Sequence, residues 1–93
     1  MPSDIEIEFD PVKDAKNLVK HGLSLTLANE FEWDVARINE DLRRPYSVRR
    51  FKASSMIGER LHELVYCLRG GVIRAISLRK SNPREIKKYA NSN

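Results

Sequence analysis

The chain has 93 residues, a net charge of +4 and charged side chains at 32% of its positions. This length suits one modest core, so we expect residues 1–93 to form a single domain. The positive charge favours anionic partners but does not distinguish RNA, DNA, an acidic protein and a membrane surface. There is no apolar stretch of about 18 residues and no signal-peptide pattern, which predicts a cytoplasmic protein without a membrane partner.

The N-terminal part of the chain carries clear local signals. Residues 5–9 alternate apolar and acidic side chains, a period of two that predicts a strand. A helix is predicted over residues 10–22, because Asp10 suits its N-cap, Pro11 its first turn and Gly22 a left-handed C-cap. We expect one apolar face of this helix to pack on the core; it comprises Val12, Ala15 and Val19. Another face is polar and comprises Lys13, Asn17 and Lys20.

The middle of the chain changes from helical to strand-like patterns. A second helix is expected over residues 24–33, followed by a short strand within residues 35–42 and a loop over residues 43–47. Residues 48–57, 61–68 and 72–78 then predict three strands in an antiparallel meander.

Glycine and capping signals define the C-terminal elements. Gly70 and Gly71 predict a tight hairpin, because both central residues of the favoured turn need positive φ. Asn82, Pro83 and Glu85 predict the cap and first turn of a short helix. The fold class is therefore α+β, with two N-terminal helices and a short C-terminal helix packed on a mostly antiparallel sheet.

The sequence offers acids, bases and cations but no metal or cofactor motif. Its two histidines are far apart, its single cysteine excludes paired-cysteine sites, and no glycine-rich phosphate loop is present. We therefore expect neither a metal nor a cofactor. Cleavage of RNA without a metal needs a base for the 2′-hydroxyl proton, cations for the phosphate and an acid for the leaving oxygen.

His21 is the most informative candidate, because histidine titrates near neutral pH. Its place at a helix C-terminus predicts a bias towards the charged form through the helix dipole. Two interpretations stay open: His21 acts as an acid or phosphate contact, or it caps the last carbonyls and fixes the corner that follows.

The basic tract of residues 79–88 is the second candidate. Its cations fall at the end of a predicted strand and in the first turns of a helix, where they and free N–H groups can converge on a phosphate. Lys13, Asn17 and Lys20 by themselves fit a solvated helix face better than a site.

Two motifs resemble the BrnT family of toxins. The first comprises Phe9-Asp10-Pro11, Lys13, Asn17, the run from Lys20 to Leu25, and Ala28. The second comprises the run from Arg74 to Ser81, then Arg84-Glu85 and Tyr89. They lie in the proper order at opposite ends of the chain.

The resemblance implies a ribonuclease toxin of a bacterial type II toxin-antitoxin pair, with a fold similar to the RelE toxins. It also implies a BrnA-like antitoxin with a ribbon-helix-helix DNA-binding part, and contact with promoter DNA only through the toxin-antitoxin complex. One segment departs from the family pattern, since Val48 and Arg49 stand where relatives commonly carry carboxylates, although Arg50 is kept.

These observations favour a metal-independent endoribonuclease, with a noncatalytic nucleic-acid-binding or antitoxin-binding module as the alternative. The residues expected in catalysis are His21, Lys20, Arg50, Arg79, Lys80 and Glu85. The residues expected to bind RNA are Lys13, Arg49, Lys52, Arg84, Lys88 and Tyr89. Which group is the acid and which the base stays open.

Overall fold

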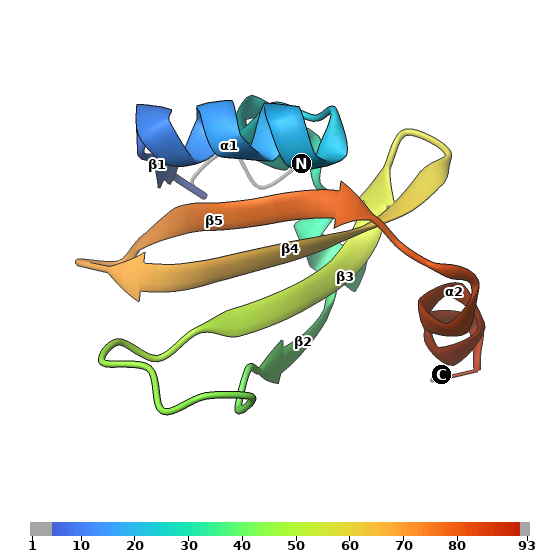
Figure 1. Cartoon of the computed structure of the whole chain (residues 1–93). Helices are drawn as coiled ribbons and strands as arrows, with labels where there is room; N and C mark the ends of the chain where they lie inside the picture. Colours follow the sequence, from blue (N-terminus) through green and yellow to red (C-terminus); the bar gives the residue numbers. More distant parts are fainter. Residues whose placement is uncertain (1–4, 92–93) are drawn as a thin grey trace.

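The computed structural model describes residues 5–91 and contains a five-stranded sheet in the order β1-β5-β4-β3-β2 (Figure 1). The strands are β1 (Ile7–Phe9), β2 (Arg37–Glu40), β3 (Phe51–Ile57), β4 (Arg60–Arg69) and β5 (Val72–Lys80). The helical elements are α1 (Pro11–His21), the 3₁₀ helices η1 (Leu25–Glu30) and η2 (Trp33–Val35), and α2 (Pro83–Ala90). β1 runs parallel to β5 and the other neighbours are antiparallel, so the predicted α+β class and meander are confirmed.

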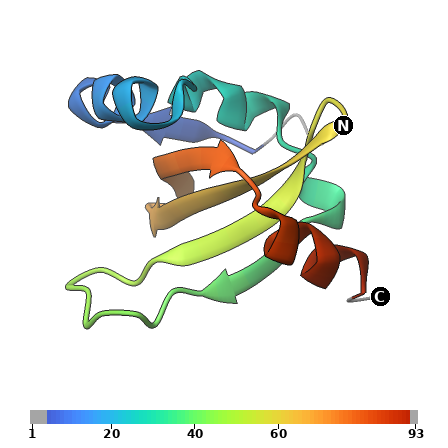
Figure 2. The same ribbon diagram turned by 45° about the vertical axis from the view of Figure 1, so that its right-hand side comes forward.

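The helices occupy two separate positions around the sheet. Figures 1 and 2 show α1 and η1 together along the β1–β5 side, and α2 apart from them beyond the end of β5. None of the helices within residues 5–91 is long and apolar enough to span a membrane.

The core lies between η1 and one face of the sheet. The meander contributes Ala53, Leu64, Tyr66, Ala75 and Leu78, and η1 with its C-cap contributes Leu25, Ala28 and Phe31. Burial of each large apolar side chain contributes about 2 kcal/mol. Because side chains alternate along a strand, Glu63, Val65 and Cys67 of β4 point to the opposite face, which we call the open face.

Local capping signals are confirmed at both α-helices. The N–H of Val12 donates to Asp10 Oδ1 at 3.0 Å, and Gly22 ends α1 with φ of 72°. Gly70 and Gly71 have φ of 59° and 80° at the predicted hairpin. These features follow from short stretches of sequence, and the structure reproduces them.

The predicted packing face of α1 is wrong. Val12 and Val19 are 61% and 90% exposed, whereas Asn17 is 4% exposed. Asn17 Nδ2 donates to Leu78 O at 2.8 Å, and Leu78 N donates to Asn17 Oδ1 at 3.0 Å. β1 pairs with β5 only over Ile73–Ala75. Beyond this stretch the edge of β5 has no strand partner within residues 5–91, and at Leu78 the side-chain amide of Asn17 forms the hydrogen bonds that a neighbouring strand would form.

Two element boundaries also differ from expectation. The segment after Ser24 forms two 3₁₀ helices instead of one longer α-helix, with Leu27 N donating to Ser24 O and Phe31 N to Ala28 O. Polar side chains that bond the nearby backbone favour such tight turns in short segments. Here the side chain of Asn29 donates a hydrogen bond to Thr26 O. β3 begins at Phe51, three residues later than expected, because its partner β2 ends opposite that residue.

Candidate active site

The junction between β5 and α2 places a carboxylate beside two cations. A capping box fixes the first turn of α2: Glu85 N donates to Asn82 Oδ1 at 2.8 Å, and Asn82 N donates to Glu85 Oε1 at 2.9 Å. This reciprocal pair turns the Glu85 carboxylate back towards the end of β5.

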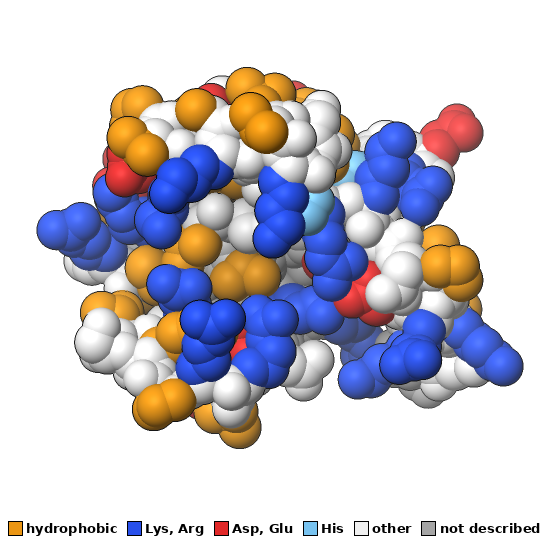
Figure 3. Space-filling view, viewed as in Figure 1, with side chains coloured by type: hydrophobic (Ala, Val, Ile, Leu, Met, Phe, Trp, Pro, Cys, Tyr) orange, Lys and Arg blue, Asp and Glu red, His pale blue; other side chains and the backbone are white. Residues whose placement is uncertain are grey.

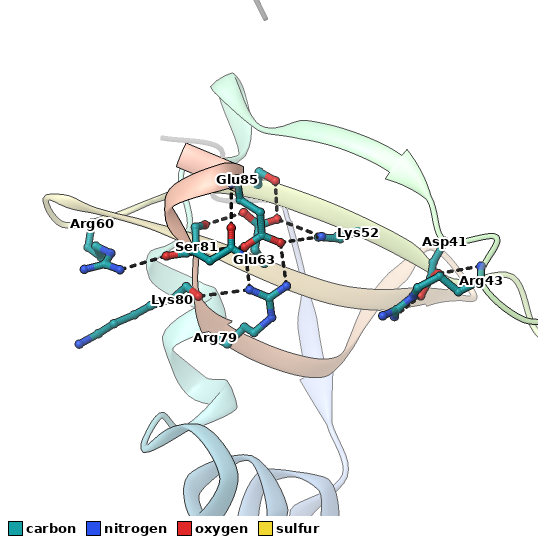
Figure 4. A network of polar contacts seen from close by, with 11 residues as sticks. Asp41, Arg43, Lys52, Arg60, Glu63, Arg79, Lys80, Ser81 and Glu85 are labelled. Atoms are coloured by element: carbon teal, nitrogen blue, oxygen red, sulfur yellow. Dashed lines mark hydrogen bonds and ion pairs between the residues drawn. The ribbon is translucent and has the colours of Figure 1, made fainter. Parts of the chain in front are cut away.

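Glu85 holds Arg79 and Lys52 in one cluster (Figure 4). Both terminal nitrogens of Arg79 donate to its carboxylate at 2.8 Å, and Lys52 Nζ donates at 2.9 Å. The Arg79 hydrogen bonds lower the pKa of Glu85 well below 4.5, with further help from Asn82 N–H and Lys52. Glu85 raises the pKa of Arg79 in return. At neutral pH the cluster therefore contains a fully ionised carboxylate that is a weak base.

A second carboxylate, Glu63, lies beneath this cluster and was not among the predicted site residues. Glu63 is 2% exposed and accepts hydrogen bonds from Ser54 and Ser81, while Lys52 Nζ lies 3.8 Å from its Oε1. The strand register sets Glu63 opposite both Ser54 and Arg79. The available signal was a glutamate directly before the apolar run of residues 64–68 in β4.

His21 ends α1 next to the same cluster. Burial is the largest effect that lowers its pKa below 6.5, and the charges of Lys20 and Arg79 lower it further. The predicted bias towards the charged form is therefore wrong, because burial and the neighbouring cations both disfavour a charged imidazole. His21 is mainly neutral at pH 7, which leaves its imidazole able to accept a proton.

The other predicted RNA-binding residues of the C-terminal tract line a groove between α2 and β2. Arg84, Lys88 and Tyr89 share this groove, of about 760 Å³, with Lys52 and Glu85. The hydroxyl of Tyr89 donates to the carbonyl of Val35 at 2.9 Å, which ties α2 to η2.

Four predicted residues lie away from the Glu85 cluster. Lys80 follows Arg79 on the strand and its side chain points away from the network (Figure 4). Arg49 donates two hydrogen bonds to Glu40, at 2.9 and 2.8 Å. Arg50 and Lys13 line a different groove, together with the exposed Val48.

Lysine and arginine side chains cover much of the face of the molecule seen in Figure 3. Figure 3 shows lysine and arginine side chains from the α1 side to the α2 side, with an apolar patch between them. The arrangement can bind phosphates at several points and offers one neutral imidazole next to a guanidinium.

Comparison with known proteins decides the family. A family model described as the ribonuclease toxin BrnT of a type II toxin-antitoxin system matches residues 9–85. The chain belongs to the BrnT family. A crystal structure of the Brucella abortus ribonuclease toxin BrnT is similar, with a TM-score of 0.65 and 22% identity over 84% of this chain and 97% of the other. The comparison with curated proteins gave no match.

Membership of the BrnT family makes this chain a ribonuclease toxin of a type II toxin-antitoxin system. Its two sequence motifs meet in space. Asn17 of the first motif bonds Leu78 of the second, and the charge of Arg79 lowers the pKa of His21. The fold thus joins the two motifs into one surface.

Proposed function

We propose that this BrnT-family toxin is a metal-independent endoribonuclease whose reaction occurs at the His21–Arg79 edge of the open face. The base removes the proton of the substrate 2′-hydroxyl, and that oxygen attacks the adjacent phosphorus. The bond from phosphorus to the 5′-oxygen breaks, the acid protonates this oxygen, and a 2′,3′-cyclic phosphate remains. The observation that carries the proposal is a neutral histidine next to a guanidinium that can bind phosphate.

Each group has a role that its surroundings support. Neutral His21 accepts the 2′-hydroxyl proton, because burial and the neighbouring cations hold its pKa below 6.5 and leave the imidazole unprotonated. Arg79 and Lys52 stabilise the negative charge that develops on the phosphate oxygens. Glu85 orients these two cations before substrate arrives. Lys20, beside His21 on α1, is the proposed proton donor.

The test uses purified toxin, free of antitoxin, with end-labelled RNA in EDTA. Cleavage with 2′,3′-cyclic phosphate ends is expected, and His21→Ala should lower kcat about 100-fold or more, in the range typical of a lost general base. Arg79→Ala should lower it comparably through lost charge stabilisation. Lys87→Gln, an exposed residue of α2 outside the groove, is the matched control and should leave kcat unchanged.

RNA that stays intact while the protein binds it would overturn the enzyme mechanism and support the noncatalytic alternative. Normal cleavage by His21→Ala would reject the assigned base and leave the ribonuclease activity standing. Cleavage that stops in EDTA and returns with a divalent cation would reject metal independence.

The biological setting follows from the family description of a type II toxin-antitoxin system. We infer a RelE-like single-domain toxin in the bacterial cytoplasm, neutralised by a BrnA-like ribbon-helix-helix antitoxin through which alone it contacts promoter DNA. Expression of the chain should arrest growth, and co-expression of the neighbouring reading frame should relieve the arrest. Relief without a complex that co-purifies would contradict direct neutralisation.

A further inference from the structure

A second basic groove lies on the open face, at a distance from the Glu85 cluster. Four cations line it, Lys13, Arg50, Arg69 and Arg74, and Cys67 and Ile76 contribute to its lining. Figure 3 shows lysine and arginine side chains beside an apolar patch on this side of the molecule.

Three of the four cations of this groove are less neutralised than Arg79 and Lys52 of the Glu85 cluster. Arg79 and Lys52 each bind a carboxylate in the Glu85 cluster. In the second groove Arg74 binds Glu8, whereas Lys13, Arg50 and Arg69 form no salt bridge with any residue in the 5–91 range. Like charges that face one groove without counterions repel each other, and a bound polyanion relieves that repulsion.

The loop before β3 holds one of these cations in place. The guanidinium of Arg50 stacks on Tyr46, 4.5 Å from the ring centroid. The Tyr46 hydroxyl donates to Asp41 at 3.0 Å, and Asp41 N donates to Arg50 O at 2.8 Å. Asp41 is itself 7% exposed and receives two hydrogen bonds from the Arg43 side chain, at 2.8 and 2.7 Å. Arg50 is thus ordered before binding, which reduces the entropy lost when a phosphate binds.

The groove continues the surface on which the reaction is proposed. Cys67 and Glu63 are four residues apart on β4 and therefore point to the same face, about 13 Å from each other. A dinucleoside monophosphate has a single phosphate and occupies one of the two positions, whereas a longer strand reaches both.

We propose that this second groove binds the backbone of the RNA strand that flanks the cleaved bond. Lys13, Arg50, Arg69 and Arg74 contact phosphates, and the apolar lining at Cys67 and Ile76 contacts a ribose or base. The apolar lining favours a nucleotide chain over an acidic peptide, whose carboxylates would use the cations alone. The inference rests on the proposed function for its substrate, and its principal test does not depend on cleavage.

Cys67 provides a direct measure of occupancy, since it is the single cysteine of the chain and lines the groove. The toxin is incubated with a 2′-O-methyl RNA of about 10 nucleotides, within the site sizes of single-strand binders. This RNA lacks the attacking hydroxyl, so it binds without being cleaved. Alkylation of Cys67 by iodoacetamide should slow at least fivefold at saturating RNA, as judged by fluorescence anisotropy. Poly-glutamate of equal charge should give little protection.

The variant Lys13→Gln/Arg69→Gln removes two exposed cations, and Lys16→Gln/Lys87→Gln removes two exposed cations outside both grooves as the charge-matched control. The first variant should lose most of the Cys67 protection, and its slope of log affinity against log salt should fall by about 1.4, at about 0.7 for each contact. The ratio of kcat/KM for a 10-nucleotide RNA to kcat/KM for a dinucleotide should be about tenfold lower in this variant than in the wild type. The control should retain all three values.

Unchanged alkylation of Cys67 by wild-type toxin saturated with RNA would overturn the groove proposal, as would equal loss in the control variant. Equal protection by poly-glutamate would assign the groove to an acidic peptide and also overturn it. Absence of RNA cleavage with full Cys67 protection would instead reject the catalytic proposal and keep the groove.

Discussion

Replacement of Glu85 by Gln tests what the carboxylate at the start of α2 does. The change preserves the size of the side chain and an oxygen that can accept from Asn82 N–H, but it removes the charge shared by Arg79 and Lys52. If Glu85 orients and neutralises these cations, the variant should remain active and bind RNA more tightly. If Glu85 is the general base, activity should collapse.

The expected magnitudes follow from the exposure of the cluster. The side chains of Arg79 and Lys52 are 34% and 36% exposed, so solvent screens both pairs and each contributes about 1 kcal/mol or less. We expect the free energy of unfolding of Glu85→Gln, measured by urea denaturation, to be lower than that of the wild type by about 1–2 kcal/mol. Because two cations lose their internal counterion, RNA affinity should rise about three- to tenfold.

The kinetic measurement separates the two roles. The pKa of Glu85 is held well below 4.5, so its carboxylate is a poor proton acceptor, and kcat should change less than tenfold. Loss of a general base typically lowers the rate 100-fold or more. A 100-fold drop in kcat with a normal unfolding curve would refute the orienting role. Glu59→Gln removes an exposed carboxylate of the β3–β4 turn and serves as the charge control.

Three further predictions concern α1. Asn17→Ala leaves Leu78 N–H and O without their partner, so the free energy of unfolding, measured by urea denaturation, should fall by about 2–4 kcal/mol. The control Val19→Ser, at a 90% exposed site, should change it by less than about 0.5 kcal/mol. Similar losses in the two variants would contradict the role of Asn17 as a partner of the β5 edge. Gly22→Ala should cost about 1–2 kcal/mol, because φ of 72° strains a residue with a Cβ, and a neutral effect in the same assay would show that the corner relaxes. Removing a neighbouring charge with Lys20→Gln should raise the pKa of His21 towards 6.5 in an NMR titration, and an unchanged pKa would show that this charge is screened.

The His21 shift also sets the direction of a stability change with pH. Its folded pKa lies below the unfolded value of 6.5, so the unfolded state takes up the proton first as the pH falls. His21 therefore makes the toxin less stable as the pH falls from about 6.5 through the folded pKa. Glu85 acts in the same direction at lower pH: its contribution is present above 4.5 and is lost as the pH falls through its folded pKa.

The sequence was sufficient wherever the cause of a structure is local. Asp10 and Gly22 delimit α1, Asn82 and Glu85 cap α2, and the glycine hairpins set the meander, because each signal lies within a few residues. The orientation of α1 has a distant cause instead. β1 stops short of the end of β5, and the free edge at Leu78 recruits Asn17, which turns the apolar side of α1 to solvent.

The candidate site followed from the sequence in part, for the same reason. Residue types near the termini made His21, Arg79 and Glu85 candidates. The placement of Glu63 depends instead on strand register, and the separation of Arg50 from Arg79 depends on the whole sheet. Burial and neighbouring charges also reversed the expected direction of the His21 pKa shift, which no local rule could supply.

The cations of the second groove differ from Arg79 and Lys52 in whether a carboxylate already binds them. Near α2, Arg79 and Lys52 are neutralised by Glu85, so a phosphate that binds them must compete with an internal carboxylate. In the second groove Lys13, Arg50 and Arg69 have no such competitor within residues 5–91. RNA should therefore gain its first affinity at the second groove and engage Arg79 afterwards, because binding there must disrupt existing ion pairs. If this proposed order holds, a short RNA should be a poor substrate even when the proposed catalytic groups are intact, since it lacks the phosphates that would bind first.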